Sequence, residues 1–109
     1  MGKPLVGDVV VVPFPQTNLQ PGKRRPAIVV ADPGGDDLVL CQITSQPRSD
    51  GFVVPLKVAD FVSGRLPLDS FVRCNRLFTV EKSVILATSG RVTSAKIADI
   101  KAKVRQLFA

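Results

Sequence analysis

Residues 7–14 read Gly-Asp-Val-Val-Val-Val-Pro-Phe, a run in which valine dominates. β-Branched residues favour strands, and the prolines near its end cannot donate to a strand ladder, so we expect a strand over 5–14. A polar loop follows at 15–25, which is long for a hairpin connection and therefore typical of a functional or mobile segment. The next run, Pro-Ala-Ile-Val-Val from residue 26, predicts a second strand over 26–32.

The rest of the chain alternates short apolar runs with turn residues. Further strands are expected at 38–44, 52–56, 70–78 and 84–87, with turns at 33–37 and 64–67 and a helical turn at 58–61. Residues 94–108 carry Ile97, Ile100, Val104 and Leu107 at helical spacing, with Thr93 or Ser94 as the cap. These elements predict a mainly β fold: a small, strongly bent antiparallel barrel with a C-terminal helix.

Composition narrows the class of protein. The 109 residues predict one domain, 1–109, and a net charge of +6 with an isoelectric point near 9.9 favours a polyanionic partner, nucleic acid first and an acidic protein second. We find neither a run of the ~20 apolar residues that a membrane helix needs nor a signal peptide, so we expect a cytoplasmic protein without a membrane partner. Cys41 and Cys74 lie in apolar runs and are expected to be buried, reduced thiols.

Several kinds of chemistry are disfavoured. The chain contains no histidine, which excludes Ser-His-Asp and Cys-His nucleophile systems and, with two cysteines, argues against a metal site. It contains no glycine-rich phosphate loop, so kinase, NTPase and dehydrogenase functions lack support. It also lacks Trp and Tyr, which disfavours a single-strand binder built on stacked aromatics. We expect no cofactor.

The loop at 15–25 could fold over whatever binds the basic site, and three clusters of polar residues could carry function. They are Lys23-Arg24-Arg25 at the start of the second strand, Thr44-Ser45-Gln46 at the end of the third, and Ser70 with Arg73, Asn75 and Arg76. Each also has a plain structural interpretation: a solvated hairpin tip, a strand end with local hydrogen bonds, and a charged edge strand. RNA cleavage would give them a common purpose, because arginine neutralises charge on a phosphoryl group and hydroxyls orient it. The sequence leaves the general base open among Asp8, Asp69 and Glu81.

The order of these motifs resembles the PemK/MazF family of toxins along nearly the whole chain. The matching segments are Gly7-Asp8-Val9-Val10-x-Val12-x-Phe14, Arg24-Arg25-Pro26-Ala27-Ile28-Val29, Cys41-Gln42-Ile43-Thr44-Ser45-Gln46, Ser70-Phe71-Val72-Arg73 and Leu77-Phe78-Thr79-Val80-Glu81-Lys82. The resemblance implies a type II toxin: a metal-independent endoribonuclease (mRNA interferase) that cleaves single-stranded RNA at short motifs. It further implies a homodimer with a Src-homology-3-like barrel, inhibited by a cognate antitoxin.

The resemblance also implies roles for particular residues. Arg25 and Thr44 would be the catalytic pair, and the RNA would be bound by Lys23, Arg24, Ser45, Gln46, Ser70, Arg73 and Arg76. The first loop would gate the groove with Asn18, Leu19 and Gln20, where some relatives carry an acidic residue. Two alternatives stay open: a non-catalytic nucleic-acid-binding barrel, and a topoisomerase-poisoning toxin of the same fold.

Overall fold

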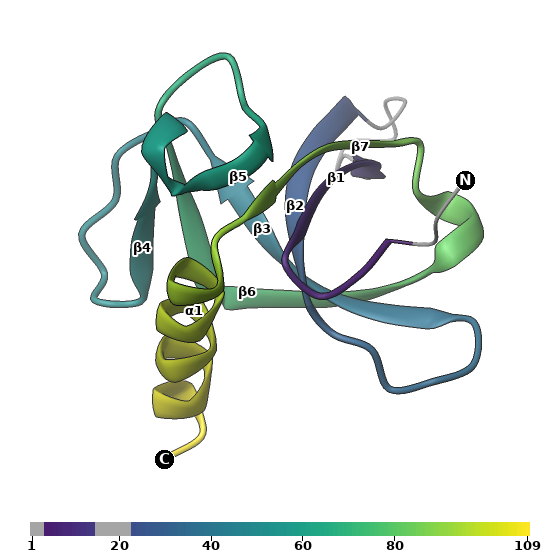
Figure 1. The fold of residues 1–109 in the computed structure, drawn as a ribbon. Helices are drawn as coiled ribbons and strands as arrows, with labels where there is room; N and C mark the ends of the chain where they lie inside the picture. Colours follow the sequence, from purple (N-terminus) through teal and green to yellow (C-terminus); the bar gives the residue numbers. More distant parts are fainter. Residues whose placement is uncertain (1–3, 15–22) are drawn as a thin grey trace.

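The computed structural model describes residues 4–14 and 23–109 (Figure 1). Seven strands form one sheet, and a single long helix, α1, closes the described chain. The elements are β1 (Asp8–Phe14), β2 (Lys23–Ala31), β3 (Asp37–Thr44), β4 (Val53–Leu56), the 3₁₀ turn η1 (Val58–Asp60), β5 (Phe61–Gly64), β6 (Ser70–Glu81), the 3₁₀ turn η2 (Lys82–Val84), β7 (Ala87–Val92) and α1 (Ser94–Leu107).

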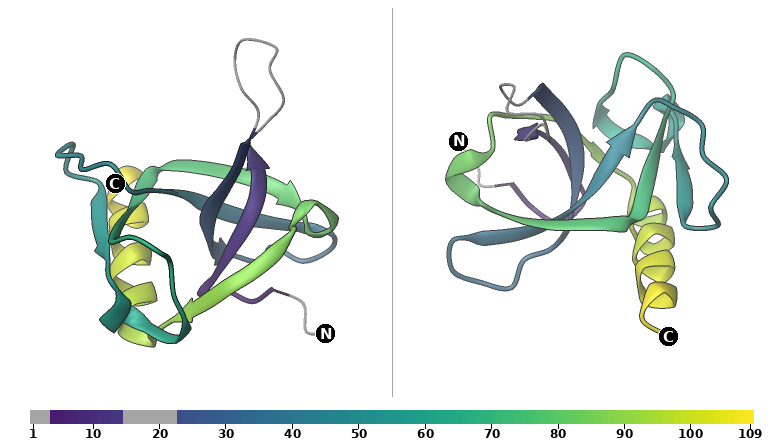
Figure 2. Two further views of the ribbon diagram at one scale, coloured as in Figure 1. Left: turned by 90° about the horizontal axis from the view of Figure 1, so that it is seen from above. Right: turned by 180° about the vertical axis from the view of Figure 1, so that it is seen from behind.

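All strand pairs are antiparallel, in the order β4-β6-β3-β2-β1-β7-β5. The sheet curls strongly into a half-barrel, as the two views of Figure 2 show. The long strand β6 pairs with β3 along most of its length and also with β4, and the β3–β6 register shifts between Cys41 and Gln42. The expected mainly β, strongly bent fold with a C-terminal helix is therefore confirmed.

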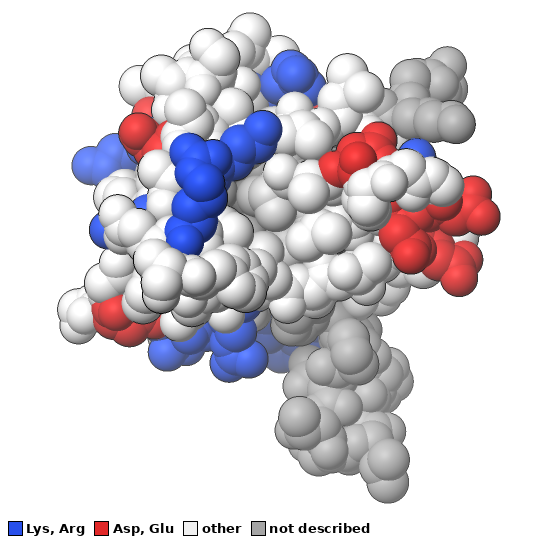
Figure 3. All heavy atoms as spheres, turned by 90° about the horizontal axis from the view of Figure 1, so that it is seen from below, with Lys and Arg blue, Asp and Glu red and all other residues white. Residues whose placement is uncertain are grey.

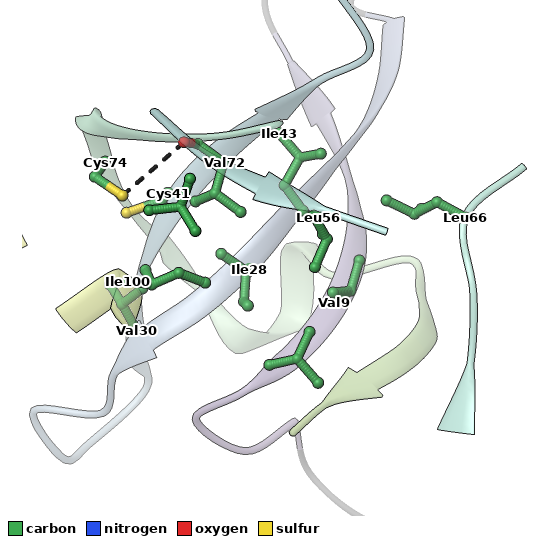
Figure 4. Close-up of a cluster of buried hydrophobic side chains, with 12 residues drawn as sticks. Val9, Ile28, Val30, Cys41, Ile43, Leu56, Leu66, Val72, Cys74 and Ile100 are labelled. Atoms are coloured by element: carbon green, nitrogen blue, oxygen red, sulfur yellow. Dashed lines mark hydrogen bonds between the residues drawn. The ribbon is translucent and has the colours of Figure 1, made fainter. Parts of the chain in front are cut away.

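Two apolar clusters lie on opposite faces of the central strands. Ile28 and Val30 of β2 belong to the first cluster, whereas Ala27 and Val29 belong to the second, because neighbouring strand residues point to opposite faces. The first cluster, shown in Figure 4, includes Ile100, through which α1 packs against the sheet. The helix lies on β2, β4 and β6. The face opposite the helix is therefore the one that carries Ala27.

The two cysteines belong to the first cluster. Cys41 and Cys74 are free thiols, fully buried, and their side chains point toward one another in Figure 4. Burial raises the pKa of Cys41 to about 12, and the neighbouring Cys74 acts in the same direction. Burial likewise raises the pKa of Cys74 to about 11, although nearby Lys103 opposes the shift. The expected buried, reduced thiols are confirmed.

Three expectations about the strands are wrong. Strand β2 begins at Lys23, because Lys23 and Arg24 pair with the end of β1, so the expected loop at 15–25 is shorter. The segment 84–87 is not a strand: Val84 ends η2, and the strand β7 begins only at Ala87. No strand was expected over Phe61–Gly64, where the sequence predicted only the end of one turn and the start of another, but strand β5 forms there and pairs with β7. The helix and the helical turn lie where the sequence placed them.

Candidate active site

A pocket of about 240 Å³ opens where β2 begins and β3 ends. Arg25 and Thr44 both line it. Their proximity follows from the antiparallel β2–β3 register, in which Ala27 pairs with Gln42. Arg25 lies two residues before Ala27 and Thr44 two residues after Gln42, so the two residues face each other at this end of the strand pair. The pocket thus joins residues that lie far apart in the sequence. Its remaining walls come from Pro26, Ile43, Ser45, Gln46, Leu66, Pro67, Leu68 and Ser70.

Thr44 is held by a turn at the end of β3. Its Oγ1 accepts a hydrogen bond of 3.1 Å from the backbone N–H of Gln46. A threonine hydroxyl has one proton to donate, and this contact does not use it. The hydroxyl is therefore oriented by the backbone and keeps its proton available for an acceptor in the pocket.

Ser70, in contrast, has its proton engaged. The hydroxyl of this nearly buried residue donates to the carbonyl oxygen of Leu68 at 2.9 Å. That bond fastens the start of β6 to the Leu66–Leu68 wall of the pocket. Ser70 lies in the pocket as expected, but its geometry suits holding the wall more than donating to a ligand.

The wall formed by Leu66, Pro67 and Leu68 was not predicted. Part of this segment was expected to be a plain turn, although two leucines around a proline carry an apolar signal. Leu66 is buried in the core, whereas Leu68 is 64% exposed. One apolar side of the pocket is therefore open to a ligand.

Arg25 supplies the positive charge of the pocket. Its side chain is exposed and makes no hydrogen bond or ion pair with residues 4–14 or 23–109. Its guanidinium is thus free to bind an anion in the described structure. Lys23 and Arg24 are also exposed on β2 but do not line the pocket, and strand alternation turns Arg24 to the other face.

Arg73 and Arg76 lie outside the pocket. Arg73 is opposite Gln42 in the β3–β6 ladder, and its side chain is only 9% exposed. Burial lowers the pKa of its guanidinium, Arg48 and Arg76 lower it further, and Asp50 at 3.9 Å raises it. Arg76 is exposed on β6. The structure therefore brings Arg73 near Thr44 along the same face of the sheet and leaves Arg76 at the surface.

The candidate bases differ in position. Asp8 is bound to Arg91 at 2.8 Å, and Glu81 lies at the far end of β6. Asp69 is exposed and lies between two residues of the pocket, Leu68 and Ser70. Of the three carboxylates, Asp69 is thus the one beside the pocket. The expected gating residues Asn18, Leu19 and Gln20 lie outside the described residues.

Charge is unevenly distributed over the surface. In Figure 3 the largest group of Asp and Glu side chains lies at the right-hand end, whereas most of the visible Lys and Arg side chains lie on the left half. The β2–β3 turn contributes Asp32, Asp36 and Asp37, and the opposite end of β2 carries Lys23, Arg24 and Arg25. An anionic ligand is therefore attracted to the end of the sheet that holds the pocket.

Two structural absences apply to the described part of the chain. No group of three or more His, Cys, Asp or Glu side chains gathers there in a way that could hold a metal ion. Among the same residues, no helix has the length and apolar character needed to cross a membrane.

The half-barrel with its C-terminal helix is the fold of a class of toxins. Residues 5–108 match the family model of the PemK-like, MazF-like toxin of type II toxin-antitoxin systems, and the chain belongs to this family. No curated protein sequence matches the chain. The resemblance seen in the sequence is therefore confirmed at the level of the family.

Solved structures share the fold at low sequence identity. A MazE-MazF crystal structure from Deinococcus radiodurans has a TM-score of 0.77 at 23% identity, covering 99% of this chain and 97% of that chain. An endoribonuclease in complex with its cognate antitoxin from a mycobacterial species has a TM-score of 0.75 at 20% identity, covering 96% and 94%. The Mycobacterium tuberculosis toxin MazF-mt6 has a TM-score of 0.73 at 15% identity, covering 93% and 95%.

Proposed function

We propose that this chain is a metal-independent endoribonuclease that cleaves single-stranded mRNA at short sequence motifs. The observation that carries the proposal is the pocket shared by Arg25 and Thr44, a free guanidinium beside an oriented hydroxyl. A phosphodiester gains negative charge on its phosphoryl oxygens during cleavage, and a cation together with a hydrogen-bond donor stabilises that charge. Family membership and the endoribonuclease named among the similar structures support the same reaction.

The reaction would be attack by a ribose 2′-oxygen on the adjacent phosphorus. The new O–P bond forms as the bond from phosphorus to the 5′-oxygen breaks, giving a 2′,3′-cyclic phosphate and a 5′-hydroxyl. The 2′ proton leaves to a base, and the 5′-oxygen gains a proton. Arg25 would stabilise the negative charge on the phosphoryl oxygens, and the Thr44 hydroxyl would donate a hydrogen bond to one of them. Asp69, which lies in sequence between two residues that line the pocket, would receive the 2′ proton.

The remaining residues of the predicted site would hold the RNA strand. Lys23 and Arg24 would attract the backbone, and Arg73 and Arg76 would extend this attraction along β6. Ser45 and Gln46 border the pocket, where they would orient the nucleotide next to the cleaved bond. We retain Asn18, Leu19 and Gln20 as the proposed gate.

The partners would be those of a toxin. We propose a cytoplasmic homodimer, with residues 1–109 forming one toxin domain, that arrests translation and growth until a cognate antitoxin binds it. Two of the similar structures contain such a pair: MazE with MazF, and an endoribonuclease with its cognate antitoxin. The net charge of +6 would favour an acidic antitoxin segment.

Incubation of the purified protein with a long mixed-sequence RNA in EDTA tests the proposal. We expect discrete fragments with cyclic phosphate ends, and no fragments from the same sequence made as 2′-O-methyl RNA, which lacks the attacking hydroxyl. Intact RNA from folded, antitoxin-free protein would contradict the proposal. Salt-sensitive binding without cleavage would then identify a nucleic-acid-binding barrel, and loss of topoisomerase activity on adding the protein would identify a topoisomerase poison.

A further inference from the structure

Three buried polar atoms beside the pocket have no hydrogen-bond partner within the described residues. They are the Oε1 of Gln42, the Nε of Arg73 and the Oδ1 of Asn75. Folded proteins leave few such atoms, because an unpaired buried polar group costs free energy comparable to a lost hydrogen bond. Their gathering at one place therefore needs an explanation, and a ligand with matching groups is one.

The three side chains form one cluster on the sheet. Gln42 lies directly opposite Arg73 in the β3–β6 ladder. Arg73 and Asn75 both contact the same oxygen of Asp50, the Oδ2, at 3.9 Å from the Arg73 Nη2 and 3.5 Å from the Asn75 Nδ2. The Asp50 contact thus orients the Asn75 amide so that its Oδ1 is the free end.

The cluster continues the surface that holds the pocket. Gln42 and Thr44 are two residues apart on β3, so their side chains leave the same face about 7 Å apart along the strand. Arg25 lies on that face of β2, two residues before Ala27, the partner of Gln42. A nucleotide bound with its phosphate between Arg25 and Thr44 can place a neighbouring base over the cluster.

Arg73 carries a charge that its surroundings compensate poorly. Its side chain is 91% buried by area, and a buried cation is costly unless it is paired and hydrogen-bonded. Asp50 is 36% exposed and its contact is long, while Arg48 and Arg76 add repulsion. The guanidinium is thus a strong donor held in place with little to donate to, which suits a fixed recognition group.

We propose that Gln42, Arg73 and Asn75 form a base-reading subsite for guanine. The cluster offers one free donor, on Arg73, and two free acceptors, on Gln42 and Asn75. The Watson–Crick edge of guanine presents the complement: the O6 acceptor and the N1–H and N2–H₂ donors. Single-stranded RNA is commonly read at this edge by side-chain hydrogen bonds.

The other bases fit the cluster less well. At this edge cytosine presents one hydrogen-bond donor and two acceptors, uracil presents one donor between two acceptors, and adenine presents one donor and one acceptor. None of these bases can therefore satisfy both free amide oxygens and the arginine Nε. Gln42 and Asn75 are half-buried, and their terminal torsions are soft, so their acceptors can turn toward a base at small cost. Guanine is the base that satisfies all three atoms at once.

This inference rests on the proposed function for the placement of the RNA, but binding tests it without cleavage. The probe is a 2′-O-methyl decamer of uridine with guanine, inosine, adenine or cytosine at its centre. Inosine lacks only the N2 amino group of guanine. We expect the guanine decamer to bind about tenfold or more tightly than the others, inosine included.

Two variants assign the preference to the cluster. Gln42→Leu and Asn75→Leu each remove one acceptor. The variant that loses the acceptor for the guanine N2 amino group should bind guanine and inosine equally. Gln106→Leu on the exposed end of α1 is the matched control and should keep the wild-type ratio. Urea unfolding verifies that each variant is folded, and Gln42→Ala or Asn75→Ala, which also removes the acceptor, replaces a variant that is not.

The outcomes separate this inference from the proposed function. A wild-type preference for guanine over inosine that one of the two variants loses supports the subsite, even if the protein cleaves no RNA. Equal binding of all four decamers overturns it, even if the protein cleaves RNA well. Lower stability of the variants with an unchanged guanine-to-inosine ratio also overturns it and makes the cluster a structural hydrogen-bond network.

Discussion

At the scale of single residues, function depends on which hydrogen-bonding groups are already used. Thr44 accepts from the Gln46 N–H and keeps its proton, whereas Ser70 donates its proton to the Leu68 carbonyl. Two hydroxyls in the same pocket therefore have different capacities. Thr44 is the one with a proton left to donate to a ligand, and Ser70 is the one that holds the wall.

Replacing Thr44 by valine should test that distinction. Thr44→Val keeps the shape but removes the donor, so we expect cleavage to slow by about 10²–10³-fold, with no change in the protein's fold. The measurement is the single-turnover rate on a cleaved RNA. The control is Thr79→Val, an exposed position further along β6, which should cleave at the wild-type rate. A normal rate for Thr44→Val would remove Thr44 from the catalytic pair.

The buried thiols predict a dependence of stability on pH. Folding raises the pKa of Cys41 from 9.0 to about 12, so this thiol stays neutral in the folded chain while it ionises in the unfolded one. Its contribution to stability is complete below pH 9 and is lost as the pH rises toward 12, by about 1.4 kcal/mol per pH unit. In urea unfolding, the stability difference between wild type and Cys41→Ala should therefore shrink between pH 9 and pH 11. A constant difference would show that Cys41 ionises equally in both states.

At the scale of elements, a close approach between β5 and β7 completes the curl of the sheet. Gly64 pairs with Gly90, and its φ of 66° lies in the left-handed region. A Cβ on Gly64 would also overlap the carbonyl oxygen of Ser89. Both the conformation and the space at this position therefore require glycine.

We expect Gly64→Ala to lower the free energy of unfolding by about 3 kcal/mol or more, from left-handed strain together with overpacking. Gly51→Ala separates the two causes, because Gly51 has a φ of 84° but nothing within 4 Å of an added Cβ. That variant should lose only about 1–2 kcal/mol. If chemical denaturation shows that both variants lose the same free energy of unfolding, the close approach of β7 to Gly64 adds no cost beyond the left-handed conformation.

Strong local patterns predicted their elements, whereas tertiary pairing determined the rest. The valines of β1 and the 3–4 spacing of apolar residues in α1 were sufficient signals. Strand β5 is four residues long and depends on β7 for its pairing, whereas β7, which contains Ser89 and Gly90, depends on both β1 and β5. The sequence pattern instead favoured 84–87, where apolar residues follow the η2 turn.

The same limit applies to the site. Arg25 and Thr44 could be predicted because family-like motifs mark them, and the β2–β3 register then brings them together. The Leu66–Leu68 wall and the Gln42–Arg73 contact could not, because they depend on a connection folding over β3 and on the shifted β3–β6 register. Such contacts are set by the curl of the sheet: the leucines around Pro67 indicate an apolar segment, but the sequence does not show what that segment packs against.

At the scale of the whole molecule, the charge distribution favours anions at the pocket end. Lys23 lies at the start of β2, close to Arg25 in sequence but outside the pocket. We expect Lys23→Ala to weaken RNA binding at low salt and to reduce the slope of log affinity against log salt by about 0.7, the value for one single-strand phosphate contact.

Fluorescence anisotropy with 2′-O-methyl RNA at several salt concentrations measures this slope. Lys57→Ala, which removes an equally exposed lysine outside β2, is the charge-matched control and should leave the slope unchanged. If both variants lose the same slope, the RNA responds to net charge alone and not to a binding surface beside the pocket.

The central claim is that the Arg25 pocket cleaves RNA, and the most direct test compares rates. Wild type, Arg25→Ala and the exposed helix variant Arg105→Ala are incubated in EDTA with an RNA that the wild type cuts. We predict a loss of about 10²–10³-fold or more for Arg25→Ala and an unchanged rate for Arg105→Ala. Equal rates for wild type and Arg25→Ala would contradict the account, because the chemistry would then lie outside this pocket.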